Sequence, residues 1–286
     1  MKVWTTYRSL SAEQRQILKA KKVELDRPID EILALLKPLA ACDKLADKSR
    51  TKMGCSFGLG VVLTIVLAVV LSNVGWSALT LLVLVAFVAA VAFAGTMYFF
   101  MKSIDLSNNF RDFALPVLTV FREDFEATKP VHLRLNLDPP TASSKKTAES
   151  APYKQGVYHK VIDTTYVDPW MTASALLVDG TKLSWEVTDE VRERKKTKRN
   201  PRGKYKTKTK YRKKTDIEVE VALRKKTYAM TAQSPGEVTS GDKRNKVRME
   251  REVRSDSLDP LNPRVLIDVV ADVYRNTRKP VKEAGA

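Results

Sequence analysis

Residues that commonly carry catalysis or bind metals are scarce in this chain. It has two cysteines, Cys42 and Cys55, and two histidines, His132 and His159. The cysteines fit neither a metal-binding spacing nor a disulfide framework, and each histidine stands alone in a segment with strand-like alternation. No G-x-x-x-x-G-K-[ST] phosphate loop, H-E-x-x-H zinc motif or G-x-S-x-G nucleophile motif occurs. We therefore expect no cofactor, no metal ion and no enzymatic activity.

Charge is absent from one long segment. The 49 residues 53–101 contain no Asp, Glu, Lys, Arg or His. A helix crosses a hydrocarbon core of about 30 Å with about 20 apolar residues, so this run is too long for one crossing and fits two. The turn-forming sequence Asn73–Ser77 interrupts it. We predict a transmembrane helical hairpin made of helices 54–72 and 78–101.

Basic residues on both sides of this segment predict its orientation. The flanks carry Lys44, Lys48, Arg50, Lys52, Lys102 and Arg111, and the turn carries no charge. Because positively charged flanks stay on the cytoplasmic side, we expect residues 1–52 and 103–286 to be cytoplasmic. Ion and proton pathways usually need ionisable groups within the membrane, so a transporter or proton channel is disfavoured. A wide pore formed by many subunits remains an alternative.

Small residues recur along both predicted transmembrane helices. Gly54 and Gly58 form a G-x-x-x-G motif, and Ala86, Ala90 and Ala94 follow one another at intervals of four. Such rows let helix backbones approach closely in lipid. They pack either the hairpin against itself, which we favour, or one hairpin against that of a neighbouring subunit.

Residues 1–52 are predicted to form cytoplasmic helices. The sequence Ser11–Gln14 resembles a capping box, which predicts a helix that runs to about Asp26. Pro28 fits the first turn of a second helix, and Pro38 is expected to kink it.

Residues 103–130 are predicted to form a juxtamembrane amphipathic helix. Its apolar side chains recur at spacings of three and four, as on one face of a helix: Phe110, Phe113, Val117, Phe121 and Phe125. This stripe either lies at the membrane interface or covers a sheet. We favour the second, because a sheet must cover its apolar face.

From residue 131 the apolar period changes from 3.6 to 2, which predicts an antiparallel β domain over residues 131–230. Residues 141–150 are expected to form a surface loop. The strand-like runs are Val131–Leu137, Val157–Val167, Trp170–Val178, Lys182–Val191 and Lys204–Leu223. Residues 231–286 are interpreted as a linker and a C-terminal helix that begins at Asn262 and Pro263. The fold class is thus an α+β membrane protein.

The last two runs predict a long hairpin, residues 181–224, with a defined register. Asn200-Pro201-Arg202-Gly203 has the signature of a type I turn. A two-residue loop would place Trp185 opposite Glu218, whereas a three-residue loop with Gly203 in the left-handed conformation places Trp185 opposite Val219. Burial of one face selects the second register.

The outer part of this hairpin is strongly basic. It contains 14 Lys or Arg residues and one Glu: Arg192, Arg194, Lys195, Lys196, Lys198, Arg199, Arg202, Lys204, Lys206, Lys208, Lys210, Arg212, Lys213 and Lys214. The predicted register sets four pairs of basic residues directly opposite each other, which destabilises a ladder. An isolated hairpin should therefore fray unless negative charge lies against it.

Three polyanions meet this requirement: anionic lipid headgroups, the acidic residues of a second copy and, ranked behind these, nucleic acid. The base of the hairpin carries such acidic residues on its even-numbered face: Glu186, Glu190, Asp216, Glu218 and Glu220. A basic tip and an acidic base are complementary head to tail, as a closed homo-oligomer requires. The remaining alternative is a solvated, disordered loop, which charge runs usually form.

From these features we expect a membrane-anchored, self-assembling scaffold protein whose basic hairpin contacts acidic surfaces on a neighbouring subunit or on anionic lipid. The alternatives are an oligomeric membrane effector or channel that perturbs the bilayer and a membrane-tethered nucleic-acid binder.

Overall fold

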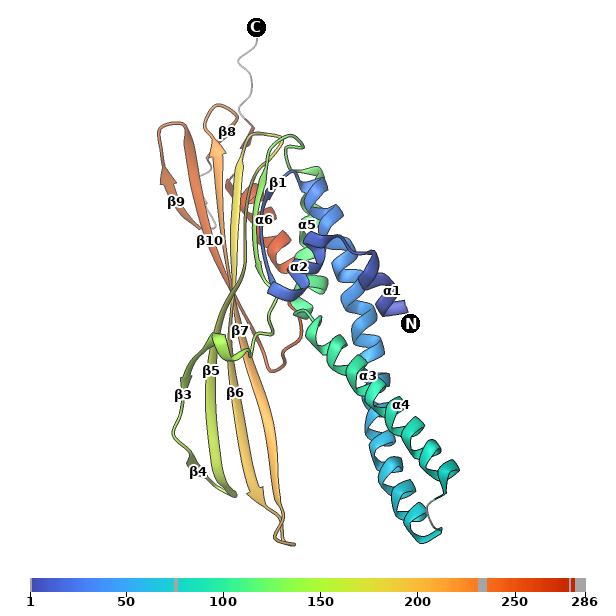
Figure 1. Cartoon of the computed structure of the whole chain (residues 1–286). Helices are drawn as coiled ribbons and strands as arrows, with labels where there is room; N and C mark the ends of the chain where they lie inside the picture. Colours follow the sequence, from blue (N-terminus) through green and yellow to red (C-terminus); the bar gives the residue numbers. More distant parts are fainter. Residues whose placement is uncertain (1, 75–76, 231–235, 278, 281–286) are drawn as a thin grey trace. The chain divides into compact units, whose positions relative to one another are not determined.

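The computed structural model describes residues 2–74, 77–230, 236–277 and 279–280. The chain divides into two compact units (Figure 1). The helical unit comprises residues 1–20 and 37–106, and the sheet unit comprises residues 21–36 and 107–286.

The helical unit contains helices α1 (Lys2–Ser9) and α2 (Ala12–Ala20), most of α3 (Ile29–Val74), and α4 (Ala78–Ser103). The predicted capping box is confirmed. The Ser11 amide donates to Gln14 Oε1 over 2.9 Å, and the Gln14 amide donates to Ser11 Oγ over 3.1 Å. The second predicted N-terminal helix and the first predicted transmembrane helix are one continuous helix of 46 residues, α3.

Helices α3 and α4 each contain a segment long and apolar enough to cross a membrane. Only 6 % of that segment is buried in α3 and 11 % in α4, so neither resembles the core helix of a soluble protein. Large apolar side chains such as Leu59, Leu79 and Leu82 are exposed. Two uncharged apolar surfaces of this size are typical of membrane proteins. Gly75 and Trp76 of the predicted turn lie outside the described residues.

The sheet unit is built on a large antiparallel sheet, as predicted. Its strand order is β1-β2-β5-β6-β7-β10-β9, and β3 and β4 also pair with β5. The bounds are β1 Lys22–Arg27, β2 Val131–Asn136, β3 Lys146–Glu149, β4 Tyr153–Gln155, β5 Tyr158–Leu176, β6 Lys182–Arg199, β7 Tyr205–Arg224, β9 Glu237–Ser240 and β10 Arg244–Ser255. A small separate sheet pairs β8 (Tyr228–Ala229) with β11 (Lys279–Pro280).

Two segments that were predicted to be helix or linker form strands instead. Residues 22–27, assigned to the first N-terminal helix, form β1, where Val23 and Leu25 face Leu135 and Leu133 of β2. Two alternating apolar residues are too few to define a period, and pairing with a distant strand decides the conformation.

Residues 244–255, assigned to the linker, form β10 instead, and residues 237–240 form β9. The apolar pattern of β10 is weak because its charged side chains pair across the sheet with acidic residues of β7.

Two smaller boundaries also differ. Residues 146–149 of the predicted surface loop form β3, after a short 3-10 turn, Ser143–Lys145. The runs 157–167 and 170–178 are joined in the single strand β5, which is interrupted only by a bulge between Pro169 and Met171.

The stripe of apolar side chains in residues 110–125 covers the sheet. These residues form a π turn (Phe110–Ala114), helix α5 (Leu115–Val120) and a 3-10 turn (Phe121–Glu123), a shorter helical segment than predicted. Phe113 packs edge-on against Trp170 with ring centres 5.5 Å apart, and Phe121 lies 5.7 Å from Trp185. The lid interpretation is thus confirmed.

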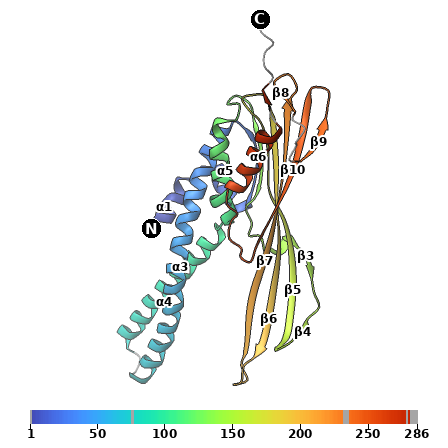
Figure 2. The same cartoon turned by 180° about the vertical axis from the view of Figure 1, so that it is seen from behind.

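Helix α6 (Arg264–Thr277) lies on the same face of the sheet as α5 (Figures 1 and 2). It begins as predicted: Asn262 Oδ1 accepts the Arg264 amide over 3.0 Å. Its buried side chains are Leu266, Val269, Val270 and Val273. The two helices cover one face of the sheet and leave the other face to solvent, which explains its alternation of apolar and polar residues.

The register of the long hairpin is the predicted one. Trp185 faces Val219, and Val187 faces Ile217. At the turn, the Asn200 amide donates to the Lys204 carbonyl and the Gly203 amide to the Asn200 carbonyl, each over 2.9 Å. Gly203 has a φ of 80°, a conformation that glycine adopts without steric cost.

A buried polar cluster lies where β5 bulges. Lys145 Nζ lies 2.7 Å from Asp168 Oδ2. The neighbouring Asp189 accepts hydrogen bonds from Asn109 over 2.9 Å and from Thr215 over 2.5 Å. Burial raises the pKa of the Asp168 carboxyl to about 6, although Lys145 acts to lower it. The contact between Lys145 and Asp168 attaches the turn before β3, Ser143–Lys145, to strand β5.

We predict that Trp185→Ala lowers the free energy of unfolding by about 3–5 kcal/mol, because the substitution leaves a cavity beneath Phe121 and Phe125. Tyr205→Ala, at a side chain that is 65 % exposed, is the control and should change it by less than about 0.5 kcal/mol. Urea unfolding followed by circular dichroism measures both. Equal effects of the two substitutions would contradict this packing.

We predict that Asp168 makes the sheet unit less stable as the pH rises. An unfolded Asp has a pKa of about 3.9, so the folded state binds the proton more tightly. The resulting stability is present below about pH 4 and is lost between about pH 4 and 6, by about 1–3 kcal/mol. Urea unfolding at several pH values should show this fall in the wild type and not in Asp168→Asn. Identical pH profiles would contradict the prediction.

Candidate polyanion-binding site

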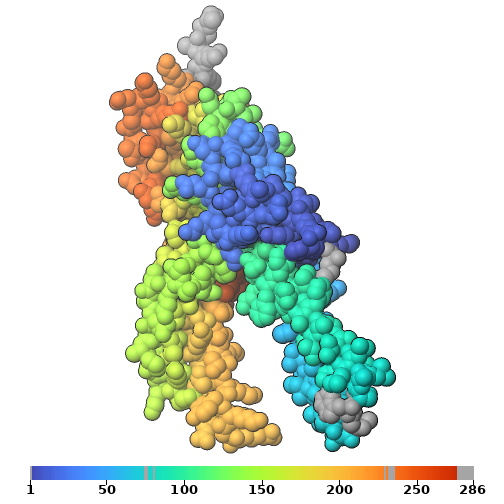
Figure 3. Space-filling model, viewed as in Figure 1, coloured from blue at the N-terminus to red at the C-terminus, as the bar shows by residue number. Residues whose placement is uncertain are grey.

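The distal half of the hairpin, residues 192–199 of β6 and 205–212 of β7, extends beyond the part of the sheet that α5 and α6 cover (Figures 1 and 3). Four pairs of basic residues face each other across it on one side of the sheet, as predicted. The pairs are Arg192 with Arg212, Arg194 with Lys210, Lys196 with Lys208, and Lys198 with Lys206. We call these eight residues the basic face.

Other predicted contact residues lie elsewhere. Lys195 is on the opposite side of the sheet, where its ammonium lies 3.1 Å from Glu193. Lys213 is buried and donates to the main-chain carbonyl of Asp259. Neither belongs to the basic face.

Lys214 lies beside the basic face but pairs with Asp216 at 3.0 Å and Glu252 at 3.2 Å. Arg199 Nε donates to the Gly203 carbonyl over 3.2 Å at the turn. Arg202 and Lys204 are exposed there.

Asp163 of β5 lies directly opposite Arg194 of β6, beside one end of the basic face. Its Oδ1 accepts Arg194 Nε over 2.5 Å, and its Oδ2 accepts Arg194 Nη2 over 2.9 Å and Arg192 Nη2 over 2.8 Å. Tyr153 also donates to it over 3.0 Å. The hydrogen bond from Arg194 is the main reason that the pKa of Asp163 lies far below its usual range. Asp163 therefore stays ionised and fixes both guanidinium groups.

The lysines of the basic face lack such a partner. Among the described residues, no carboxylate forms an ion pair with Lys196, Lys198, Lys206, Lys208 or Lys210. Opposed like charges raise the local positive potential and weaken the ladder. An external anion would relieve both effects.

The acidic residues at the base of the hairpin are largely neutralised within the chain. Glu218 pairs with Arg248 of β10 at 2.7 Å, and Glu220 with Lys246 at 3.0 Å. Asp216 shares Lys214. Sequence reasoning missed these pairs because it did not identify β10 as a strand.

Two acidic residues of this set are exposed, and neither forms an ion pair among the described residues. Glu186 lies opposite Glu218, and Glu190 lies opposite Lys214 in the ladder.

The predicted transmembrane packing residues divide into two groups. A Cβ added at Gly54 would lie 3.2 Å from Tyr98, whereas one added at Gly58 would meet no atom within 4 Å. Ala86 and Ala90 are exposed, and Ala94 is half-buried. A Cβ added at Gly60 would lie 2.8 Å from Val91, and one added at Gly95 would lie 2.7 Å from Phe57, so these glycines make room for side chains of the other helix.

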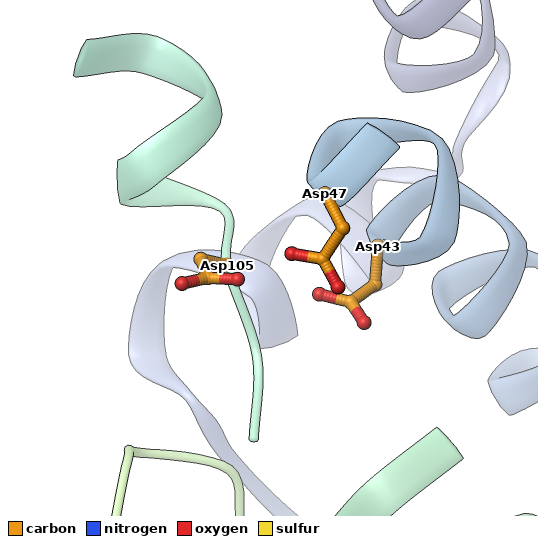
Figure 4. A group of neighbouring side chains, drawn as sticks. All are labelled: Asp43, Asp47 and Asp105. Atoms are coloured by element: carbon orange, nitrogen blue, oxygen red, sulfur yellow. The ribbon is translucent and has the colours of Figure 1, made fainter. Parts of the chain in front are cut away.

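A cluster of three carboxylates in the helical unit was not foreseen. Oxygen atoms of Asp43, Asp47 and Asp105 lie within 4.8 Å of one another (Figure 4). Arg50 contacts Asp105 and lies 3.3 Å from Asp47, and Asp43 accepts the Leu106 amide over 2.9 Å.

Burial raises the pKa of Asp105, and the neighbouring Arg50 opposes that shift. Because Arg50 pairs with two of the three carboxylates, we interpret the cluster as a structural link between α3 and the segment after α4. Its residues are too far apart in the sequence to be recognised as a group.

In comparisons with protein families, characterised proteins and solved structures, the chain matches none.

Proposed function

We propose that this chain is a two-pass membrane protein whose sheet unit binds polyanionic surfaces, and in particular anionic lipid headgroups, through the basic face. The observation that supports this most is the set of five lysines aligned on one side of the β6–β7 ladder with no carboxylate partner among the described residues. Each basic side chain near an anionic membrane contributes roughly 1 kcal/mol. Their combined contribution is enough to hold the sheet unit on a lipid surface.

In this proposal both termini and the sheet unit are cytoplasmic. The basic flanks of the uncharged segment support that orientation. The cytoplasmic leaflet is also the anionic one, so the anchored chain and its ligand lie on the same side of the membrane.

Self-assembly into a homo-oligomeric scaffold is the second candidate. It is supported by Glu186 and Glu190, which are exposed at the base of the hairpin and complementary to the basic tip of another copy. Lipid is favoured over this candidate because Glu218 and Glu220 are already paired with β10.

We predict that replacing Lys198, Lys206, Lys208 and Lys210 with Gln lowers binding to phosphatidylserine vesicles by at least about 100-fold, since four contributions of roughly 1 kcal/mol are lost. The measurement is co-sedimentation of the full chain, held in phosphatidylcholine nanodiscs, with large vesicles.

The matched control also replaces four exposed lysines with Gln, but outside the basic face: Lys182, Lys225, Lys226 and Lys243. It should bind phosphatidylserine vesicles like the wild type. Equal binding by both variants would contradict the lipid proposal. A change in native mass confined to the first variant, with vesicle binding intact, would instead favour self-assembly.

We predict the orientation from cysteine labelling of intact cells. In a background with Cys42→Ser and Cys55→Ser, an impermeant thiol reagent should modify Ser77→Cys from outside. It should modify Ser257→Cys only after permeabilisation. Labelling of Ser257→Cys in intact cells would contradict a cytoplasmic sheet unit.

A further inference from the structure

A groove runs along the basic face where β10 leaves the sheet. Strand β10 pairs with β7 only as far as Ser255 opposite Lys213, and the chain that follows borders the free edge of β7. The groove has a volume of about 600 Å³, and its charged lining consists of Arg192, Arg194, Lys196, Lys210, Arg212 and Asp256. A second hollow of about 370 Å³ shares Arg192, Arg212 and Asp256 with it.

The charge of this lining is strongly positive. Asp256 is its one acidic residue, and it offsets little: its carboxylate lies 3.6 Å from Arg212, and both side chains are more than 80 % exposed. Exposed pairs of this kind contribute at most about 1 kcal/mol. The groove therefore retains the charge of several basic groups.

Two of these basic groups are held in fixed positions. Asp163, whose side chain is only 11 % exposed, binds one edge of the Arg194 guanidinium with two hydrogen bonds and Arg192 with one. A guanidinium has five N–H donors, so three remain on Arg194 and four on Arg192. Arginines that are already oriented lose less entropy when they bind an anion.

We infer that this groove is a discrete site for a polyphosphorylated ligand, such as an inositol phosphate that is either free or the headgroup of a lipid. The inference deepens the proposed function and rests on it. The volume lies in the range of about 300–1,000 Å³ that is usual for small-molecule sites and is larger than a single phosphate needs. Each phosphate carries about −1.5 to −2 charges and accepts paired hydrogen bonds from arginine. Two or three phosphates thus match the lining in size and charge.

Two substitutions separate a discrete site from diffuse attraction. Asp163→Asn makes the surface more positive, so diffuse attraction predicts equal or tighter binding, whereas a site that depends on oriented arginines predicts weaker binding. Arg194→Lys conserves charge and removes the planar fork. We expect each to weaken binding by about 10- to 100-fold.

The controls are Glu250→Gln and Lys182→Arg. Glu250 is exposed on β10, lies outside the groove and is 3.5 Å from Arg248, so Glu250→Gln also removes one negative charge. Lys182 is exposed and lies outside the groove and the basic face, and Lys182→Arg conserves charge. Both controls should bind within about twofold of the wild type, a difference well below 1.4 kcal/mol.

The probes are inositol hexakisphosphate in calorimetry, and vesicles that contain phosphatidylinositol 4,5-bisphosphate or a charge-matched amount of phosphatidylserine. A loss of affinity for inositol hexakisphosphate assigns the groove to free or lipid-borne inositol phosphates. A loss seen only with the bisphosphate vesicles assigns it to the lipid.

Wild-type affinity in both Asp163→Asn and Arg194→Lys, with anionic vesicles still bound, would overturn the discrete site and leave the proposed function standing. No binding of the wild type to any anionic vesicle would overturn the proposed function itself. Tighter binding of a single-stranded oligonucleotide than of inositol hexakisphosphate would overturn the ligand class.

Discussion

The antiparallel ladder between β6 and β7 is the interaction on which the sheet unit depends. With 18 residues, β6 is about 60 Å long, and it changes character along its length. At one end its rungs pair Trp185 with Val219 and Val187 with Ile217 under the cover of α5 and α6. At the other end they pair Lys196 with Lys208 and Lys198 with Lys206. Burial stabilises the first end, and repulsion weakens the second.

Charge is balanced differently in the two halves of the sheet. On the outer face of the covered half, acidic and basic side chains alternate across strands, as in the pairs Glu24–Arg134 and Glu218–Arg248. On the distal half, two carboxylates approach the basic face: Asp163, which two arginines share, and the exposed Asp256, 3.6 Å from Arg212. The excess positive charge is therefore concentrated at one end of a single element. This is the arrangement expected for a surface that meets an external anion.

Several features could be predicted from local sequence, because local chemistry determines them. The turn at Asn200–Gly203 follows from the residues in it, and the hairpin register follows from the need to bury Trp185. The capping box at Ser11 is equally local. The phenylalanine lid was recognised because its helical spacing adjoins a segment of period two.

Other features depend on contacts between distant segments and could not be predicted in this way. Strand β1 has only two apolar positions, and β10 is predominantly charged, so neither shows a clear period. The role of Asp163 requires the register between β5 and β6, which the bulge after Pro169 shifts. In the sequence, the only local signal for this role of Asp163 is a single acidic residue in the strand that lies opposite a basic run. The candidate groove was therefore only partly predictable: its arginines were identified, but the residue that orients them was not.

Hydrogen exchange at the distal rungs tests most directly whether an external anion stabilises this ladder. The measurement compares amide exchange of the full chain in neutral nanodiscs and in nanodiscs that contain phosphatidylserine. If the basic face binds lipid, exchange at Lys196, Lys198, Lys206 and Lys208 should slow by about tenfold or more in the anionic discs, since about 1.4 kcal/mol of added stability corresponds to tenfold. Exchange at Trp185 and Val219 should not change. Equal exchange of the distal amides in the two kinds of disc would contradict the account.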